Sequence, residues 1–214
     1  LPIGSGPTSR EPLIRDVVPL AGLDNLVFGG WDPITTNVLE AARTARVLDR
    51  EHLEPIAAEL EAIVPMEAVF DRRWVSRLEG VRVKTQTSKW AQAHALIDDI
   101  ARFKAQHKCE RLVMVWCGST EAYSEPQAVH ASAAAFEQGL RDDDPAIAPS
   151  QIYAWAALQS HVPLANGAPS GSTGPRSARS TFGVPSFAMS RKSVAALPEV
   201  PTIIESGLPG IEMS

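Results

Sequence analysis

The segment RLVMVWCG, residues 111–118, is the strongest strand pattern in the chain and indicates the class of fold. It is apolar on both faces, which is typical of a parallel strand whose sheet is covered by helices on both sides. A helical pattern precedes it and ends in basic residues that suit a helix C-terminus. The apolar positions of that helix are Leu96, Ile97, Ile100 and Phe103. A helix that leads into a buried strand favours a βαβ architecture.

The alternation of strands and helices continues on both sides of this segment. NLVFGG (25–30) is typical of a buried strand that runs into a turn, and VPLAN (162–166) predicts another buried strand. Thr35 or Thr36 is expected to cap the first helix. Apolar spacing predicts helices within 38–48, 51–64, 128–140 and 149–160. This order predicts an α/β fold with a doubly wound parallel sheet.

Composition limits the classes of protein to which the chain can belong. Its 214 residues allow one domain or one domain with a tail, and 44% hydrophobic residues allow a sizeable core. A net charge of -5 argues against a nucleic-acid partner. No apolar run reaches roughly 18 residues, which argues against a membrane span. Cys109 and Cys117 are expected to be reduced thiols, and no signal peptide is visible, which together favour a cytoplasmic location. Because the chain begins with Leu1, upstream sequence is expected to be missing.

The chain changes character after Asn166. Residues 170–180 are mainly Gly, Ser, Thr, Pro and Arg, with little apolar surface to bury. Such a composition is typical of a linker. We therefore expect a partial domain over 1–169, a Gly/Ser/Pro-rich linker over 170–186 and an irregular, unrelated tail over 187–214.

Three stretches that follow predicted strands hold candidate binding residues, because ligands of open α/β sheets bind beyond the carboxyl ends of strands. GGWD places Asp32 there, where its carboxylate can accept hydrogen bonds from ribose hydroxyls or else cap the next helix. CGSTE, from Cys117 to Glu121, has small residues that let backbone N–H groups approach a cofactor, with a polar capping turn as the alternative. NGAP, from Asn166 to Pro169, follows the next strand, and a plain β-turn is its alternative.

Other patterns are weaker. GSG at residues 4–6 lacks the third glycine of a phosphate-binding loop. The five histidines are scattered, so no metal site is predicted. A nucleophilic triad of Cys117, His130 and Glu121 can be imagined, but the spacing does not fix its geometry. No catalytic residue is therefore predicted, and the tryptophans are expected to be packing residues.

Four stretches resemble a known family: PLIRDVVPLAGLDNLVFGGWDP, EHLEPIAAELEAIVPMEAVFD, RLVMVWCGSTEAY and DPAIAPSQIYAWAALQSHVPLANGAP. From about Glu11 to Pro169 the chain resembles myo-inositol-1-phosphate synthase of the bacterial type. The resemblance implies a Rossmann-like domain that binds NAD, and an NAD-dependent isomerisation of glucose 6-phosphate to myo-inositol 1-phosphate. It also implies that NAD is contacted by Asp32, Cys117, Gly118, Ser119, Thr120, Asn166, Gly167 and Ala168.

The resemblance also implies parts that this sequence lacks. The family's Gly-rich phosphate loop lies upstream of the matching region, and its catalytic lysines and oligomer-forming domain come after NGAP. Here Lys192 is the only lysine after Lys108, and its surroundings match no motif of the family. We therefore expect an incomplete Rossmann-like sheet and an inactive fragment. The family forms homo-oligomers, but the assembly domain is expected to be missing.

The tail resembles a second family. FAMSRKSVAALPEVPTIIESGLPGIEMS (187–214) is similar to a segment of the substrate-binding proteins of tripartite tricarboxylate transporters. An ordinary Pro/Gly-rich surface tail is the alternative. On the first interpretation, SGSTGPRSARS (170–180) joins two unrelated coding fragments.

Three functional hypotheses follow. The first is an inositol-phosphate synthase, or a remnant of one, with NAD as cofactor and glucose 6-phosphate as substrate. The second is an inert or partner-dependent NAD-binding fragment that acts as an interaction module. The third is a periplasmic carboxylate-binding protein, which would need an export signal upstream of Leu1. The first is preferred, with no nucleic-acid partner and no membrane association.

Overall fold

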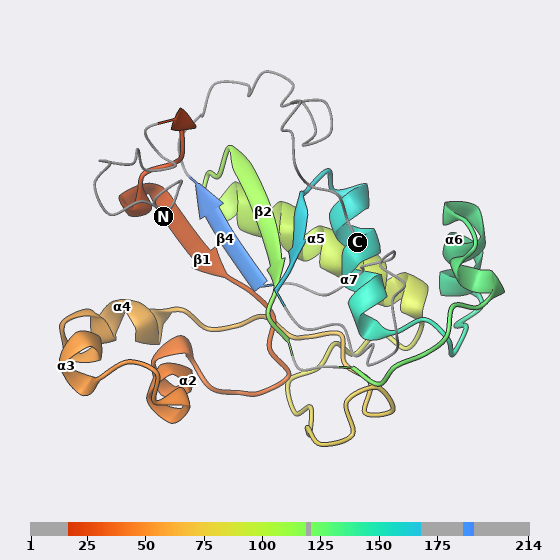
Figure 1. Cartoon of the computed structure of the whole chain (residues 1–214), viewed down its shortest axis with the longest axis horizontal. Helices are drawn as coiled ribbons and strands as arrows, with labels where there is room; N and C mark the ends of the chain where they lie inside the picture. Colours follow the sequence, from red (N-terminus) through yellow and green to blue (C-terminus); the bar gives the residue numbers. More distant parts are fainter. Residues whose placement is uncertain (1–16, 119–120, 168–185, 191–214) are drawn as a thin grey trace, which may run out of the picture.

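The strands form one open sheet in which three share a direction and a fourth is reversed (Figure 1). The computed structural model describes residues 17–118, 121–167 and 186–190. The sheet order is β1-β4-β2-β3, with β1 (Leu26–Gly29), β2 (Arg111–Trp116), β3 (Leu164–Asn166) and β4 (Ser186–Ser190). β2 is parallel to β3, and β4 is antiparallel to both β1 and β2, so β1, β2 and β3 run the same way. The expected α/β class is confirmed.

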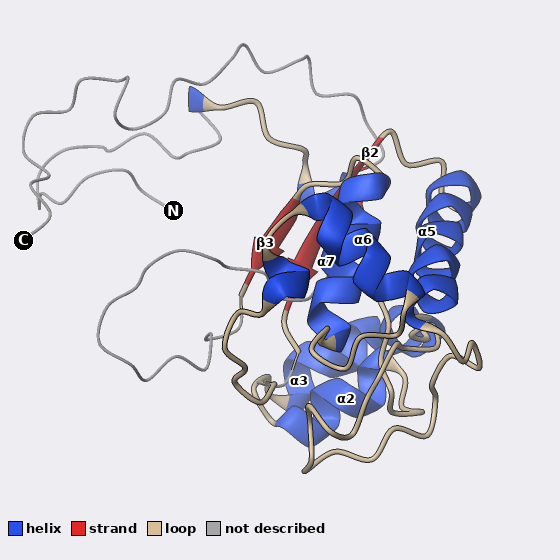
Figure 2. Cartoon of the chain, turned by 90° about the vertical axis from the view of Figure 1, so that its right-hand side faces the viewer, coloured by secondary structure: helices blue, strands red, loops and turns tan. Residues whose placement is uncertain are grey.

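The helices form two groups. α5 packs against both α6 and α7 beside the sheet, whereas α2, α3 and α4 lie together beyond the end of β1 (Figures 1 and 2). Their bounds are α2 (Val38–Ala45), α3 (Arg50–Leu53), α4 (Ala57–Ala62), α5 (Lys89–Gln106), α6 (Ala133–Arg141) and α7 (Pro149–Gln159). Short 3-10 turns are η1 (Leu23–Asn25), η2 (Glu54–Ile56) and η3 (Ala128–His130). Within the described residues, no helix combines the length and the apolar character needed to cross a membrane.

The core lies between the sheet and the pair α5 and α7. Leu112 and Met114 of β2 are buried in it, together with residues of both helices such as Leu96 and Ile152. The next residue on the other face of β2, Val113, is 43% exposed. Among the described residues the helices therefore cover one face of β2, although helices were expected on both. The reason is that α2, α3 and α4, which connect β1 toward β2, lie beyond the strand end instead of over the sheet.

Several helix ends differ from those expected. α2 is capped by Asn37, whose side chain accepts the N–H of Glu40, and not by Thr35 or Thr36. The helix predicted over 51–64 is divided into α3, η2 and α4, with Pro55 in the first turn of η2, where its missing N–H is tolerated. The helix predicted over 128–140 is likewise divided, because the Ser132 side chain caps α6 after η3.

Strand β4 comes from the part of the sequence expected to be an irregular tail. Ser186 pairs with Val115 and Phe187 pairs with Gly29, so β4 begins at the edge of the sheet where β1 and β2 end. Because β4 lies between two strands, its backbone groups are paired on both sides. The tail therefore contributes to the same sheet as the predicted domain.

Replacing Ala188 with proline should lower the melting temperature. Ala188 pairs with both Phe28 and Val113, and a proline in a central strand cannot donate its ladder hydrogen bond. The carbonyl that loses its donor costs about 1–3 kcal/mol. Differential scanning fluorimetry measures the change, with Ala195→Pro, outside the range of β4, as the control. Equal melting temperatures for the two variants would contradict the pairing of β4.

Candidate functional site at the carboxyl edge of the sheet

The carboxyl ends of β1, β2 and β3 lie along one edge of the sheet. Trp116, the last residue of β2, pairs with Asn166, the last residue of β3, and β1 ends at the same edge two strand positions away. The turns that follow these strands carry the sequence-predicted residues Asp32, Cys117, Gly118 and Gly167. Ser119, Thr120 and Ala168 lie outside the described residues. The edge therefore brings together the described members of all three predicted stretches.

Trp116 explains the two glycines that follow β2 and β3, Gly118 and Gly167. The Gly167 N–H donates to the Trp116 carbonyl oxygen at 2.8 Å, and a Cβ at Gly167 would lie 2.9 Å from that oxygen. A Cβ at Gly118 would lie 2.3 Å from the Trp116 ring. Real Cβ atoms do not approach so closely, so side chains at these two positions would force Trp116 to move. Both glycines are required by packing, whatever ligand the edge binds.

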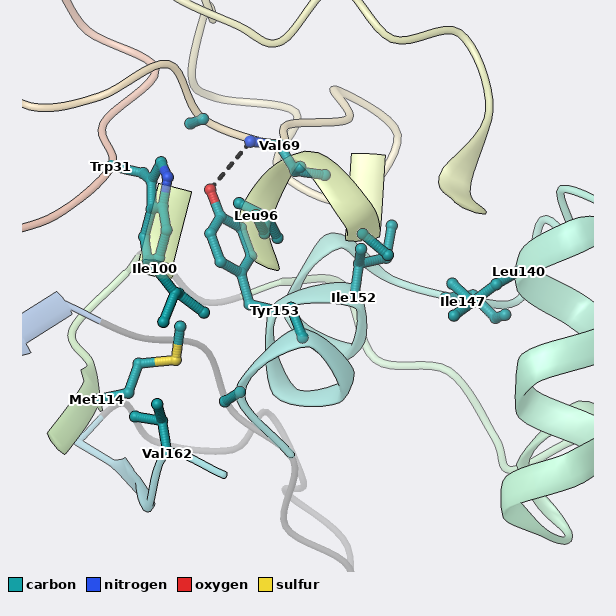
Figure 3. Packing of buried hydrophobic residues seen from close by; sticks show 14 of the residues in the cluster. Trp31, Val69, Leu96, Ile100, Met114, Leu140, Ile147, Ile152, Tyr153 and Val162 are labelled. Carbon is teal, nitrogen blue, oxygen red and sulfur yellow. Dashed lines mark hydrogen bonds between the residues drawn. The ribbon is translucent and has the colours of Figure 1, made fainter. Parts of the chain in front are cut away.

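Tyr153 of α7 holds the core beneath this edge. Its hydroxyl accepts the Val69 N–H at 2.9 Å, and its ring meets Trp31 edge-to-face with centroids 5.1 Å apart (Figure 3). The centroid of the Trp116 ring lies 6.4 Å from that of Tyr153. Burial raises the pKa of Tyr153 well above its usual range, so the hydroxyl stays protonated. Trp31, two residues after β1, and Trp116, the last residue of β2, thus both pack near one tyrosine.

Asp32 sits in a turn that is held mainly by backbone hydrogen bonds. Its Oδ1 accepts the N–H of Ile34 at 2.8 Å, and its own N–H donates to the Met66 carbonyl at 3.2 Å. The Pro33 carbonyl accepts the N–H groups of Val81 and Arg82, both at 2.8 Å. Because Asn37 caps α2, Asp32 does not serve as that cap. Among the described residues no hydrogen bond is made to Oδ2 of Asp32, so this half-buried carboxylate keeps an acceptor for a ligand.

Asp99 was missed by the sequence reasoning. This α5 residue is buried, and its carboxylate accepts from Trp31 Nε1 at 2.7 Å and Lys84 Nζ at 2.5 Å. Arg102, one turn later on α5, donates to the other carboxylate oxygen. A signal was present, since Asp99 lies three residues after Leu96 and therefore on the apolar face of the predicted helix. A carboxylate on that face needs buried partners.

Glu121 lies five residues after the end of β2. Its carboxylate accepts the N–H of Ser150 at 3.0 Å, in the first turn of α7. A hollow of about 440 Å³ adjoins it, lined by Glu121, Ala122 and residues 74–78. Burial raises the pKa of Glu121, and the hydrogen bonds from Ser150 oppose this only in part. Glu121 therefore acts first as a cap for α7.

The imagined nucleophilic triad is not assembled. His130 accepts the Gln127 N–H at Nδ1, and its Nε2 lies 3.2 Å from the side-chain oxygen of Gln151. Glu121 is engaged with Ser150, and Cys117 is exposed. These contacts place the histidine and the carboxylate in separate capping arrangements at η3 and α7.

Comparisons with known proteins agree on one family. The family model described as myo-inositol-1-phosphate synthase, an NAD-binding model, matches residues 3–181. Inositol-3-phosphate synthase 1 of Bacteroides thetaiotaomicron is 44% identical over 162 residues, which cover 75% of this chain and 38% of that protein. The inositol-3-phosphate synthase of Spirodela polyrhiza is 30% identical over 158 residues, covering 72% of this chain and 31% of that protein.

A solved structure extends the likeness to the fold. The crystal structure of inositol-3-phosphate synthase from Caenorhabditis elegans has a TM-score of 0.69 and 25% identity, covering 73% of this chain and 32% of that chain. The Rossmann-like assignment is thereby confirmed. The chain spans between 31% and 38% of the length of these relatives.

Replacing Tyr153 with phenylalanine should destabilise the fold. The change removes the acceptor of the buried Val69 N–H while the ring stays in place, and a buried donor without a partner costs about 1–3 kcal/mol. Urea denaturation measures the loss in the free energy of unfolding. The matched control is Tyr123→Phe, because Tyr123 is 61% exposed. If both substitutions had the same effect, the Tyr153 hydrogen bond would not support the core.

Replacing Glu121 with glutamine should stabilise the protein increasingly as pH rises. A raised folded-state pKa means that Glu121 favours the folded state while protonated, below its usual pKa. This contribution is lost as pH rises through the raised value, whereas glutamine stays neutral and still accepts the Ser150 N–H. Melting temperatures measured from about pH 4, near the usual pKa of a glutamate, up to about pH 8 show the effect. Glu51→Gln, at an exposed position of α3, is the control, and a gain independent of pH would contradict the assignment.

Proposed function

The chain belongs to the myo-inositol-1-phosphate synthase family, and we propose that its α/β domain binds NAD at the carboxyl edge of the sheet for the isomerisation of glucose 6-phosphate to myo-inositol 1-phosphate. The observation that carries the proposal is the position of Asp32. It lies three residues after the end of β1, at the edge shared with the ends of β2 and β3. Nucleotide-binding sheets place an acidic residue there to accept the ribose hydroxyls.

The described residues fit the ribose part of a dinucleotide. Asp32 offers Oδ2 at the edge where Gly118 and Gly167 follow β2 and β3, and the space beside both glycines is taken by Trp116. The bond from Gly167 to Trp116 fixes these two turns against each other. Asp32, Cys117, Gly118, Asn166 and Gly167 are therefore the described residues that we propose to hold the adenosine end.

The described residues do not supply a cradle for the pyrophosphate. In dinucleotide-binding folds that group sits on a Gly-rich turn that follows a central strand and opens a helix. The central position between β1 and β2 is held here by β4, which runs the other way and ends at the opposite edge. We therefore expect weak NAD binding by the 214-residue chain alone.

NAD, when bound, supplies a hydride acceptor for the sugar and then returns the hydride. The part that this chain's residues play in our proposal is to bind and orient the cofactor. Asp32 accepts hydrogen bonds, and the Tyr153 core keeps the edge rigid. We do not expect isomerase activity from the 214 residues alone, because no lysine between Lys108 and Lys192 is present to stabilise the charge of the reacting sugar.

We propose separately that residues 187–214 derive from the transporter substrate-binding proteins that they resemble. The family match ends at residue 181, before Phe187, which supports a change of origin there. We also propose a cytoplasmic location, as expected for an enzyme that acts on a sugar phosphate.

NAD should raise the melting temperature of the chain, and Asp32→Asn should weaken that effect. A ligand that binds only the folded state adds about 2.7 kcal/mol of stability at a hundredfold excess over its Kd. Loss of a hydrogen bond to a charged group should raise the Kd roughly tenfold. The measurement is thermal unfolding over an NAD titration up to millimolar concentration. Asp24→Asn, an exposed residue at the opposite end of β1, is the control. An unchanged melting temperature of the parent chain would contradict NAD binding.

A further inference from the structure

We infer that Asp99 is a positioning residue, which acts through Trp31 and Lys84 to fix the turn that carries Asp32 and thereby sets the affinity of the edge for ribose hydroxyls. The inference rests on the proposed function, because it assigns a role in nucleotide binding to a residue that lies inside the core. Its basis is a set of contacts that reach Asp32 from both sides.

The first contact reaches the residue before Asp32. Trp31 is bonded covalently to Asp32, and its indole Nε1 donates to Asp99 Oδ2 at 2.7 Å. The ring is also seated edge-to-face on Tyr153 (Figure 3). The hydrogen bond fixes the rotation of the indole on this seat, and the backbone of Trp31 follows the ring. Trp31 also forms a parallel bridge with Met66, which accepts the Asp32 N–H.

The second contact reaches the residue after Asp32. Lys84 donates from Nζ to the same Asp99 oxygen at 2.5 Å. The backbone N–H of Lys84 donates to the Ala68 carbonyl oxygen at 2.8 Å. This hydrogen bond fixes the position of the extended segment that contains Arg82. The N–H of Arg82 in turn donates to Pro33, directly after Asp32. The Asp99 carboxylate therefore contacts both segments that fix the Asp32 turn. One contains Trp31, and the other contains Arg82 and Lys84.

The energetics favour a role in positioning over one in stability alone. The side chains of Asp99 and Lys84 are 5% and 7% exposed, and a buried ion pair of this kind is often no more stabilising than apolar residues of similar size. An apolar residue at position 99 would continue the stripe between Leu96 and Phe103. What an apolar residue cannot do is orient an indole N–H and an ammonium group at the same point.

The test separates the hydrogen bond from the packing. Trp31→Phe removes the indole N–H and keeps an aromatic ring on Tyr153, whereas Trp155→Phe makes the same change in the Trp90 and His94 cluster. By isothermal titration calorimetry, W31F should raise the Kd for NAD roughly five- to tenfold. W155F should leave the Kd unchanged.

A double-mutant cycle shows whether the effect passes through Asp32. If Trp31 acts by placing the carboxylate, W31F should have no further effect on the Kd in a chain that already carries D32N. A merely structural role would give the same loss with and without D32N, and that result would overturn the inference. Lys84→Met tests the second contact in the same way, and it stands in if W31F does not fold.

A spectroscopic readout keeps the two proposals distinguishable. The indole N–H resonance of Trp31, identified as the one lost in W31F, should shift in Asp99→Asn but not in Asp98→Asn, because Asp98 is the exposed neighbour on α5. Absence of that shift would overturn the contact itself. If the parent chain did not bind NAD while the shift was seen, the proposed function and the affinity role that depends on it would both fail, although the contact would stand. If the parent bound NAD but W31F and K84M left the Kd unchanged, only the positioning role would fail.

Discussion

The hydrogen bond that the Val69 N–H donates to the Tyr153 hydroxyl is buried, and the arrangement of the carboxyl edge depends on it. Val69 belongs to the segment between α4 and α5, residues 63–88, which contains only isolated bridges and no helix. A buried N–H in such a segment must find an acceptor, and the tyrosine hydroxyl on α7 is the one that it finds. Because the same ring contacts both Trp31 and Trp116, one side chain connects the turn after β1 with the end of β2, and these two strands are not neighbours in the sheet.

The position between β1 and β2 poses a second constraint. A sheet can leave its outermost strands unpaired, but two internal edges facing each other would expose two rows of backbone groups. β4 pairs with both edges, and it does so in the antiparallel direction because it enters from the carboxyl edge where Asn166 ends β3. The consequence for function is direct. A reversed strand pairs the edges as well as a parallel one, but it cannot present a turn and a helix N-terminus at the carboxyl edge.

The elements that could be predicted from sequence are those whose cause is local. Apolar runs identify β1 and β2, and Pro149 marks the start of α7. The convergence of Asp32, Cys117 and Gly167 follows from the direction of the strands alone. What sequence could not show is set by distant partners: the reversed strand β4, the face of β2 that the described helices leave exposed, and the buried bonds of Asp99. For Asp99 the local pattern indicated an aspartate on an apolar face, but only the fold brings Trp31 and Lys84 to it.

Glycines after strands are often taken as signs of a nucleotide site, and this edge shows why that reasoning needs a second observation. Gly118 and Gly167 are both required by Trp116, through its ring and its carbonyl oxygen. Their presence would be explained in a domain that bound nothing. Asp32 is different, because its local turn uses one carboxylate oxygen and its backbone N–H, while no hydrogen bond from the described part of the chain reaches the other oxygen. A ribose site requires a charged side chain that is held in place near a strand end and still has a free acceptor. Asp32 meets this requirement, so the case for NAD depends on Asp32 more than on the glycines.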